Sequence, residues 1–235
     1  RYVGLVLNLK GLDRPVGAGC TEIGMVTAAT DSFAQRNQGA PIDDTVRAWE
    51  EIAPLAKASG LRAQVTVSVA FGCPFEGEVP TERVVGLVKR LAQSAPLEIA
   101  VGDTIGVAVP SQVTTLIEAL KSTVPHLPLR CHFHNTRNTA VANAYAAVMA
   151  GVNTLDASVG GIGGCPFAPN ATGNVATEDL LYMLTRAGFE TGIDLQRLID
   201  TARWLEAQRG KAVPSMLSKA GGFRRPAATN PLIQT

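Results

Sequence analysis

Short apolar runs alternate with helix-like stretches along most of the chain. The apolar runs predict six strands, at residues 2–8, 21–26, 62–69, 97–101, 129–136 and 153–158. Helical patterns lie between and after them, at residues 41–59, 80–93, 110–120, 138–150, 177–187 and 194–208. This alternation is typical of β/α units built around a parallel sheet.

The connections carry further expectations. A short helix is expected from Lys10, and the polar stretch through Asp31, Arg36 and Asn37 is expected to be a long loop. Pro54 should kink the helix that begins near residue 41, because proline removes one helical hydrogen bond. The tail from residue 221 has little pattern.

The number of strands leaves two architectures open. A closed α/β barrel needs eight parallel strands with matched tilt and shear. Six strands therefore form either an open, doubly wound sheet or a barrel that lacks two of its β/α units. Periodicity alone does not decide between these architectures.

Composition favours a small-molecule substrate. The chain has 235 residues, of which 46% are hydrophobic, and its 21 basic and 20 acidic residues give a net charge of +1. This balance offers no electrostatic footprint for nucleic acid or an anionic membrane, and no apolar run reaches the ~20 residues of a membrane span. The four cysteines show no paired spacing, which suits a reducing compartment rather than a disulfide scaffold.

Two imidazoles lie at the end of the strand that begins at Leu129. His132 and His134 are two of only three histidines, and a spacing of two in a strand places both side chains on one face. Such a pair can bind a metal ion through two nitrogens, at the end of the strand where α/β barrels carry their active sites. The alternative is that both rings are hydrogen-bonded packing residues.

Other reactive groups follow strands. Asp103 comes directly after the strand at 97–101, where an aspartate can also serve only as a helix cap. Cys165 lies in a loop with four glycines and a proline, so it is either a reactive residue on an adaptable loop or a small filler in a glycine-rich turn. Asn174 and Glu178 flank the start of the helix at 177, and capping is again the alternative role.

Several motifs together resemble the 3-hydroxy-3-methylglutaryl-CoA lyase family, within the metal-dependent lyase and aldolase TIM barrels. The similarity extends to about residue 208, and its most specific block joins Gly-Gly-Cys-Pro to Gly-Asn-x-Ala-Thr-Glu-Asp. The segments that carry it are Asn8-Leu-Lys-Gly11, Phe71-Gly-Cys-Pro-Phe-Glu-Gly77, Gly102-Asp-Thr-Ile-Gly106, His132-Phe-His134, Gly161-Ile-Gly-Gly-Cys-Pro-Phe-Ala168 and the run from Ala171 to Met183.

The resemblance implies both an activity and a site. It implies cleavage of an acyl-CoA substrate, 3-hydroxy-3-methylglutaryl-CoA or a close 3-hydroxyacyl-CoA, to acetyl-CoA and acetoacetate or the corresponding keto acid. His132, His134 and Asn174 would bind a divalent cation, Mg²⁺ or Mn²⁺. Cys165 would be the catalytic loop cysteine, Asp103 a polar residue at the reaction centre and Glu178 a supporting residue near the metal.

The resemblance also implies the setting in which the enzyme works. It implies a homodimer without a nucleic acid or membrane partner, located in the cytoplasm of a bacterium or in the mitochondrial matrix of a eukaryote. Residues 1–209 would form the barrel domain and residues 210–235 a C-terminal extension. A related aldolase or Claisen-type synthase is the alternative activity, and a catalytically inactive barrel is the alternative from another class.

Two departures from the family pattern qualify these expectations. The strand at 2–8 corresponds to the family's third strand, so this chain carries strands 3 to 8 of a (β/α)8 barrel. By this resemblance the chain as written would lack a metal-binding Asp and an Arg from strand one and a Glu from strand two, and we expect it to be inactive. Asn135-Thr-Arg137 stands where the family usually has Asp-Thr-Tyr, which makes a 3-hydroxy-3-carboxyalkyl-CoA an alternative substrate.

Overall fold

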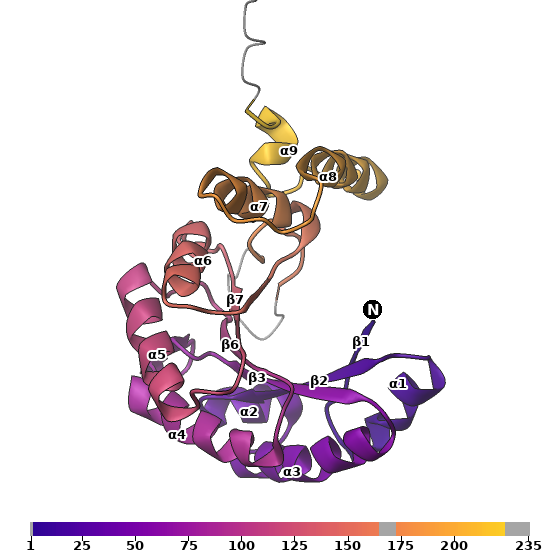
Figure 1. The fold of residues 1–235 in the computed structure, drawn as a ribbon, viewed down its shortest axis with the longest axis vertical. Coiled ribbons are helices and arrows are strands. Elements are labelled where there is room, and N and C mark those ends of the chain that lie inside the picture. Colours follow the sequence, from indigo (N-terminus) through magenta and orange to yellow (C-terminus); the bar gives the residue numbers. More distant parts are fainter. Residues whose placement is uncertain (1, 165–172, 224–235) are drawn as a thin grey trace, which may run out of the picture.

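A curved parallel sheet organises the computed structural model, which describes residues 2–164 and 173–223. Six strands are hydrogen-bonded in the order β1-β2-β3-β6-β7-β8, and every neighbouring pair is parallel. Figure 1 shows that the sheet bends like part of a barrel wall. The strands are β1 (Val3–Leu5), β2 (Glu22–Ala28), β3 (Arg62–Ser68), β6 (Ile99–Asp103), β7 (Leu129–Phe133) and β8 (Thr154–Asp156); a separate antiparallel hairpin joins β4 (Gly72–Cys73) to β5 (Gly77–Glu78).

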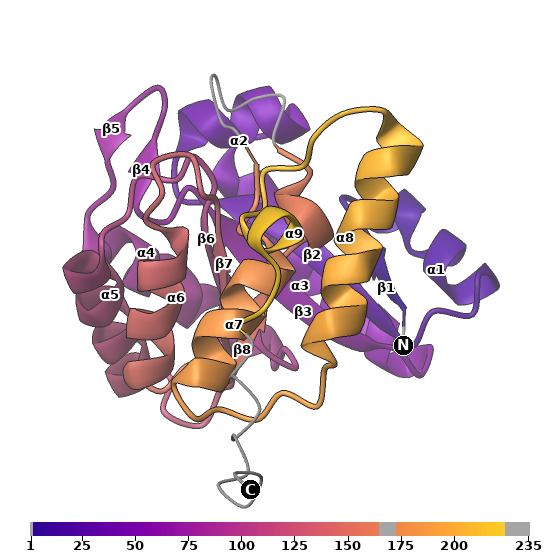
Figure 2. The same ribbon diagram turned by 90° about the horizontal axis from the view of Figure 1, so that it is seen from above.

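Helices α3, α4, α5 and α6 line the outer side of the sheet, and α7, α8 and α9 lie beyond β8 (Figures 1 and 2). A strand followed by a helix on the outer face is the repeating unit of a TIM-type barrel, and the described chain forms six strands of such a barrel. The helices are α1 (Asp13–Gly17), α2 (Asp31–Gln38), α3 (Ile42–Ala58), α4 (Thr81–Leu91), α5 (Pro110–Thr123), α6 (Ala140–Met149), α7 (Thr177–Arg186), α8 (Leu195–Arg209) and α9 (Leu217–Ala220), with 3₁₀ turns at Leu9–Gly11, Ala92–Ser94 and Val159–Gly161.

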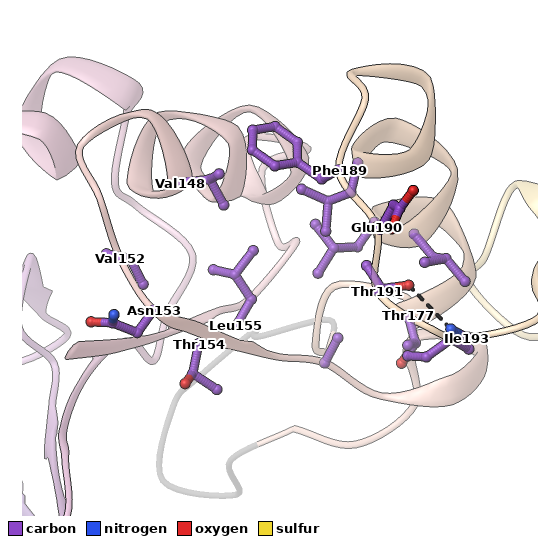
Figure 3. A pocket seen from close by; sticks show the side chains of 14 residues that line it. Val148, Val152, Asn153, Thr154, Leu155, Thr177, Phe189, Glu190, Thr191 and Ile193 are labelled. Carbon is purple, nitrogen blue, oxygen red and sulfur yellow. Dashed lines mark hydrogen bonds between the residues drawn. The ribbon is translucent and has the colours of Figure 1, made fainter. Parts of the chain in front are cut away.

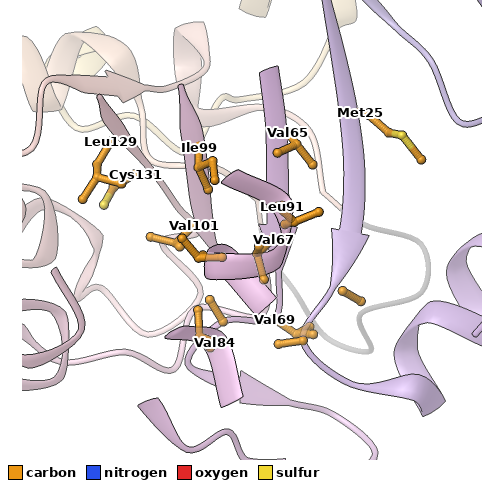
Figure 4. Close-up of a cluster of buried hydrophobic side chains, with 14 of the residues drawn as sticks. Met25, Val65, Val67, Val69, Val84, Leu91, Ile99, Val101, Leu129 and Cys131 are labelled. Atoms are coloured by element: carbon orange, nitrogen blue, oxygen red, sulfur yellow. The ribbon is translucent and has the colours of Figure 1, made fainter. Parts of the chain in front are cut away.

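The two faces of the sheet have different chemistry because side chains alternate along each strand. Odd-numbered residues of β2, β3, β6 and β7 point outward and form the buried core under the helices, as Figure 4 shows for Met25, Val65, Val67, Ile99 and Val101. The register pairs even-numbered residues of these strands and of β8 with one another on the inner face. That inner face carries polar and charged residues, among them Glu22, Gln64, Glu98, Arg130, His132 and Asp156.

Helix α3 shows how the outer layer is held. Its fully buried residues Val46, Trp49, Ile52 and Ala56 recur at helical spacing and face the sheet. Burying each of the larger side chains contributes about 1.5–3 kcal/mol to folding. The Trp49 indole Nε1 also donates a 3.0 Å hydrogen bond to the carbonyl of Leu91 at the end of α4, so the largest core residue leaves no polar atom unpaired.

The structure differs from the sequence-based expectations at one expected loop and at several element ends, where β1, β7 and β8 are shorter than predicted. The expected loop through Asp31 and Asn37 is helix α2, which Asp31 favours in its first turn and Gly39 ends at φ +72°. Helix α6 begins at Ala140 rather than at 138, because Asn138 has φ +58° and cannot continue a right-handed helix. Helix α3 includes Pro54 within a single run of 17 residues.

Within residues 2–164 and 173–223, no helix has both the length and the apolar character that a membrane span requires.

Candidate active site

The candidate site lies at the C-terminal ends of β7 and β8. His132 is on the inner face of β7, directly opposite Asp156 of β8 in the parallel register. The His132 Nδ1 atom is hydrogen-bonded to the Asp156 carboxylate. The exposed fraction of the side chain is 29% for His132 and 35% for Asp156. The pair therefore faces the interior of the half-barrel and not the hydrophobic core.

His134 lies near His132 but is placed by a different backbone contact. It follows the last residue of β7 and forms an isolated antiparallel bridge with Asn174. The flanking hydrogen bonds, Asn135 N to Gly173 O at 2.9 Å and Val175 N to Phe133 O at 3.0 Å, make this bridge a non-hydrogen-bonded pair. In such a pair the two side chains project to the same side and lie close together.

The two imidazole rings are neighbours, as their spacing predicts. Their centroids are 5.1 Å apart in an edge-to-face arrangement. His134 is only 4% exposed, and burial, with the neighbouring His132 as a second cause, lowers the pKa of His134 to about 4. Its ring is therefore neutral at physiological pH, which is the state that binds a metal ion.

A cation fits the donors that remain. The Nδ1 atom of His134 is buried and has no hydrogen-bond partner among the described residues. Asn174 donates from Nδ2 to the carbonyl of Ile162 at 2.9 Å, which leaves its amide oxygen as an acceptor. Two imidazole nitrogens and one amide oxygen suit a divalent ion of intermediate hardness, such as Mn²⁺, better than Mg²⁺, which prefers oxygen ligands.

Among the residues that the structure describes, no three acidic, histidine or cysteine side chains are placed to hold a metal ion together. The candidate site therefore consists of His132, His134 and the amide of Asn174.

Asp103 lies beside the site, but its carboxylate is hydrogen-bonded to backbone amides. Its side chain is 1% exposed, and its carboxylate accepts hydrogen bonds from Val107 N at 2.9 Å and Ala108 N at 3.1 Å. Burial raises the pKa of Asp103, although these amides and the charge of Arg137 oppose the shift. Since Asp103 pairs with Phe133, its side chain is on the opposite face from His132, while its carbonyl accepts from His134 N at 3.2 Å.

Glu178 also acts on the backbone. It is fully buried in the first turn of α7, and both of its carboxylate oxygens accept from Gly160 N at 3.1 Å. Gly160 is in the turn that leads toward Cys165, which lies outside the described residues. Glu178 therefore fixes the start of the connection that carries the predicted cysteine.

The two departures at residues 135 and 137 have structural roles. The Asn135 amide oxygen accepts from Ala140 N at 3.2 Å, at the first turn of α6. The Arg137 guanidinium donates to the carbonyls of Ile105 and Gly106 at 2.9 and 3.0 Å. Arg137 thus connects the β6–α5 loop to the β7–α6 loop. Its guanidinium group donates to backbone carbonyls, which partly offset its positive charge.

Sequence reasoning missed Asp156 and Arg130. Both are on the inner face of the sheet, and the Arg130 Nη1 atom is 3.6 Å from Asp156 Oδ2. Their proximity depends on which residues of β7 and β8 are paired, and the alternation within each strand cannot supply that register. The available signal was a charged residue at an inner position of each strand.

Two cavities differ in their relation to the histidines. One of about 450 Å³ is lined by His132 and Asp156, with apolar residues such as Leu5, Val26 and Phe33 across from them. The other, of about 560 Å³, lies on the outer side of β8 beside α6 and α7 and has a mostly apolar lining (Figure 3). Of these two cavities, only the one of about 450 Å³ contacts the candidate site, because no histidine lines the other.

The fold and the paired histidines define the class of protein: an α/β barrel protein of the TIM type with a candidate cation site at the C-terminal ends of its strands. Residues 2–205 match the HMGL-like family model, and the chain belongs to that family.

Individual relatives agree with this assignment. The chain is 39% identical to an (R)-citramalyl-CoA lyase of Chloroflexus aurantiacus, with 94% of this chain and 70% of the relative covered. It is 37% identical to a hydroxymethylglutaryl-CoA lyase of Bacillus subtilis, with 91% and 72% covered. A structure of an HMG-CoA lyase from Acinetobacter baumannii, in complex with coenzyme A and 3-methylmalate, matches with a TM-score of 0.89 and 38% identity over 96% of this chain and 74% of that one.

Proposed function

We propose that this protein is a divalent-metal-dependent carbon–carbon lyase that cleaves a 3-hydroxyacyl-CoA with a tertiary hydroxyl group. The observation that carries the proposal is the convergence of His132, His134 and Asn174 within a chain of the HMGL-like family. Acetyl-CoA would be one product, and acetoacetate or another keto acid the second.

The proposed cation would be held by one nitrogen of each histidine and by the amide oxygen of Asn174. When bound, it would polarise the hydroxyl and a carboxylate of the substrate. The neutral state of His134 and its unpaired buried nitrogen support this role. Asp103 and Glu178 would act as positioning residues. Their carboxylates accept hydrogen bonds from backbone amides of loops and do not point into the open space beside the histidines.

Cleavage requires two proton transfers. A base removes the proton of the tertiary hydroxyl, and the electrons of the carbon–carbon bond pass to the enolate of acetyl-CoA as the carbonyl of the keto acid forms. The enolate carbon then needs a proton, which we assign to the thiol of Cys165. The support for this role is the position of Cys165 in a connection whose start is fixed by Glu178.

The acyl group is the open part of the proposal. Relatives whose names specify citramalyl-CoA and hydroxymethylglutaryl-CoA match the chain at 39% and 37% identity. We propose that the substrate belongs to one of these two types, with 3-hydroxy-3-methylglutaryl-CoA as the first to test. We further propose that the protein acts as a homodimer.

The test is a cleavage assay with both thioesters and Mn²⁺ or Mg²⁺. The lyase proposal expects acetyl-CoA from at least one thioester, an outcome that would overturn the sequence-based expectation that the chain as written is inactive. It also expects about a 10²–10⁴-fold loss of rate in Cys165→Ala, as is typical when a proton donor is removed. Cys20→Ala, a half-buried cysteine near α1, is the matched control and should retain the wild-type rate. If Cys165→Ala cleaves at that rate as well, Cys165 is not the proton donor; if the protein binds metal but cleaves neither thioester, the lyase proposal fails and a synthase-type reaction is the alternative.

A further inference from the structure

A row of alternating charges crosses the inner face of β6, β7 and β8. The Arg130 guanidinium is paired with the Glu98 carboxylate on one side and lies 3.6 Å from Asp156 Oδ2 on the other. The Thr154 hydroxyl donates to the second oxygen of Glu98 at 3.1 Å. The row ends at His132, whose Nδ1 atom is bonded to Asp156.

Strand register sets this order. Arg130 is paired with Thr154 and His132 with Asp156 across β7 and β8, so His132 meets Asp156 at its own level, while Arg130 reaches the same carboxylate from two residues earlier on β7. Glu98 immediately precedes β6 and is 6% exposed, which anchors the far end of the row in a nearly dry environment. The geometry of Asp156 is therefore fixed from two sides, by Arg130 and by His132.

We propose that Asp156 is a positioning residue for the cation site: it holds His132 in the tautomer with hydrogen on Nδ1, so that the Nε2 lone pair is free for a metal ion. This inference rests on the proposed function. A carboxylate accepts only from a protonated ring nitrogen, so the hydrogen bond determines which nitrogen remains for the cation. Carboxylate partners of this kind orient metal-binding histidines and increase their basicity.

Asp156 is a partner of the ligand and not itself a ligand. One of its oxygens is bonded to His132, and the other lies toward Arg130. Within residues 2–164 and 173–223, no hydrogen-bond partner is present for the Nδ1 atom of His134, so the orientation of its ring is not fixed by a carboxylate as that of His132 is. Arg130 in turn prevents Asp156 from turning away.

The first test reads the tautomer without metal or substrate. Long-range ¹H–¹⁵N NMR spectra at pH 8.5 distinguish the two neutral tautomers of an imidazole, and the chain has only three histidines to assign. We expect His132 as the Nδ1–H tautomer in the wild-type protein, and a shift toward the Nε2–H tautomer in Asp156→Ala. Asp200→Ala, on the exposed side of α8, is the control and should leave His132 unchanged. A His132 that is Nε2–H in the wild type, or is unaffected by Asp156→Ala, overturns the proposal.

The second test measures Co²⁺ binding by titration calorimetry on the same proteins. Asp156→Ala should bind about 10–100-fold more weakly than the wild type, the range known for partners of metal ligands. Asp156→Asn keeps an acceptor without the charge and should lose less, which guards against a folding defect in the alanine variant. If the wild type and Asp156→Ala bind Co²⁺ equally well, the proposed role of Asp156 is wrong. If the wild type binds no Co²⁺, the proposed metal site is wrong, and the role of Asp156 is wrong with it.

Discussion

Two histidines that are two residues apart have opposite surroundings. His132 is part of β7 and is hydrogen-bonded to a carboxylate, whereas His134 lies past the strand end, is almost fully buried and finds no partner for Nδ1 in the described part of the chain. The sequence predicts that their rings converge, because a period of two requires it. It could not predict the difference between them, since Asp156 and Asn174 come from separate segments that are placed by backbone pairing.

The lowered pKa of His134 predicts a pH dependence of stability in the metal-free protein. Its pKa falls from 6.5 to about 4 on folding, so the unfolded chain binds more protons between these values. The free energy of unfolding should decrease as the pH falls from 6.5 to 4, with a contribution of about 3 kcal/mol from this group.

Urea unfolding at several pH values in the presence of a chelator checks this prediction. The variant His134→Gln should show a shallower slope between pH 4 and 6.5. The comparison must be a difference between the two proteins, because burial raises the pKa of Asp103 and this group acts in the opposite sense. Equal slopes in the two proteins would show that His134 does not carry the effect.

The amide of Asn174 gives a second prediction at this scale. Its Nδ2 donates to Ile162 while its oxygen is available to a cation, and aspartate lacks the donor. Asn174→Asp should therefore destabilise the metal-free protein by about 1–3 kcal/mol, because a charged oxygen would face the Ile162 carbonyl. Thermal unfolding with and without Mn²⁺ measures the effect, and an unchanged metal-free Tm would contradict it.

Among the elements, the connection from β8 to α7 depends on acidic residues in the first turn of α7. Glu178 holds Gly160, and Asp179 accepts hydrogen bonds from Met216 N and Leu217 N at 2.9 and 2.8 Å. Ser215 N donates to Gly160 O at 3.2 Å, so the segment after α8 and the connection before α7 contact one another. The sequence predicts two acidic residues at a helix start, but not that they bind other segments in place of their own helix.

Glu178 is testable by paired substitutions. Glu178→Ala leaves the buried Gly160 N–H without an acceptor and should lower the free energy of unfolding by about 1–3 kcal/mol. Glu178→Gln keeps one acceptor oxygen and should cost less. Hydrogen exchange at the Gly160 amide reports the local effect, and exchange that is equally slow in the alanine variant would contradict the assigned role.

Helix α2 shows where the hydrophobic pattern fails as a predictor. Of its eight residues only Phe33 and Ala34 are buried, so the segment has too few apolar positions to show helical periodicity. Its end contacts are tertiary: Ile42 N donates to Asp31 at 2.8 Å, and Ser32 binds Glu76. Longer helices such as α3 and α5 present a full apolar stripe, and the sequence predicts them to within a few residues.

At the scale of the whole molecule, periodicity predicted the number and the parallel direction of the strands, whereas the barrel architecture was predicted only by the resemblance to the lyase family. Strong alternation of strands and helices predicted six parallel strands, and the structure confirms them. An open doubly wound sheet would place helices on both faces, whereas here α3 to α6 cover one face (Figure 1) and charged residues such as Arg130 and Asp156 lie on the other. The polar inner face therefore distinguishes the barrel from an open sheet. Its polar residues come from five strands, so no single strand of the sequence reveals it.

Cation binding should stabilise the whole fold, because the proposed ligands come from segments 40 residues apart. A ligand at 100 times its dissociation constant adds about 2.7 kcal/mol to the free energy of unfolding. Mn²⁺ should therefore raise the Tm of the wild-type protein, and EDTA should reverse the increase. His132→Ala should retain the metal-free Tm within a few degrees and lose the increase; an equal increase in that variant would exclude His132 as a ligand.

The alternation along the strands has an evolutionary consequence. In β2, β3, β6 and β7, the core residues have odd numbers, with Ala28 as the exception, and the residues of the inner face have even numbers. Substitutions at even positions can therefore alter recognition while the core remains intact, and effects at well-separated sites of the two kinds should be nearly additive. Proteins with this sheet can therefore change the residues of the inner face, and with them the molecules that they recognise, without a change in the residues that stabilise the fold.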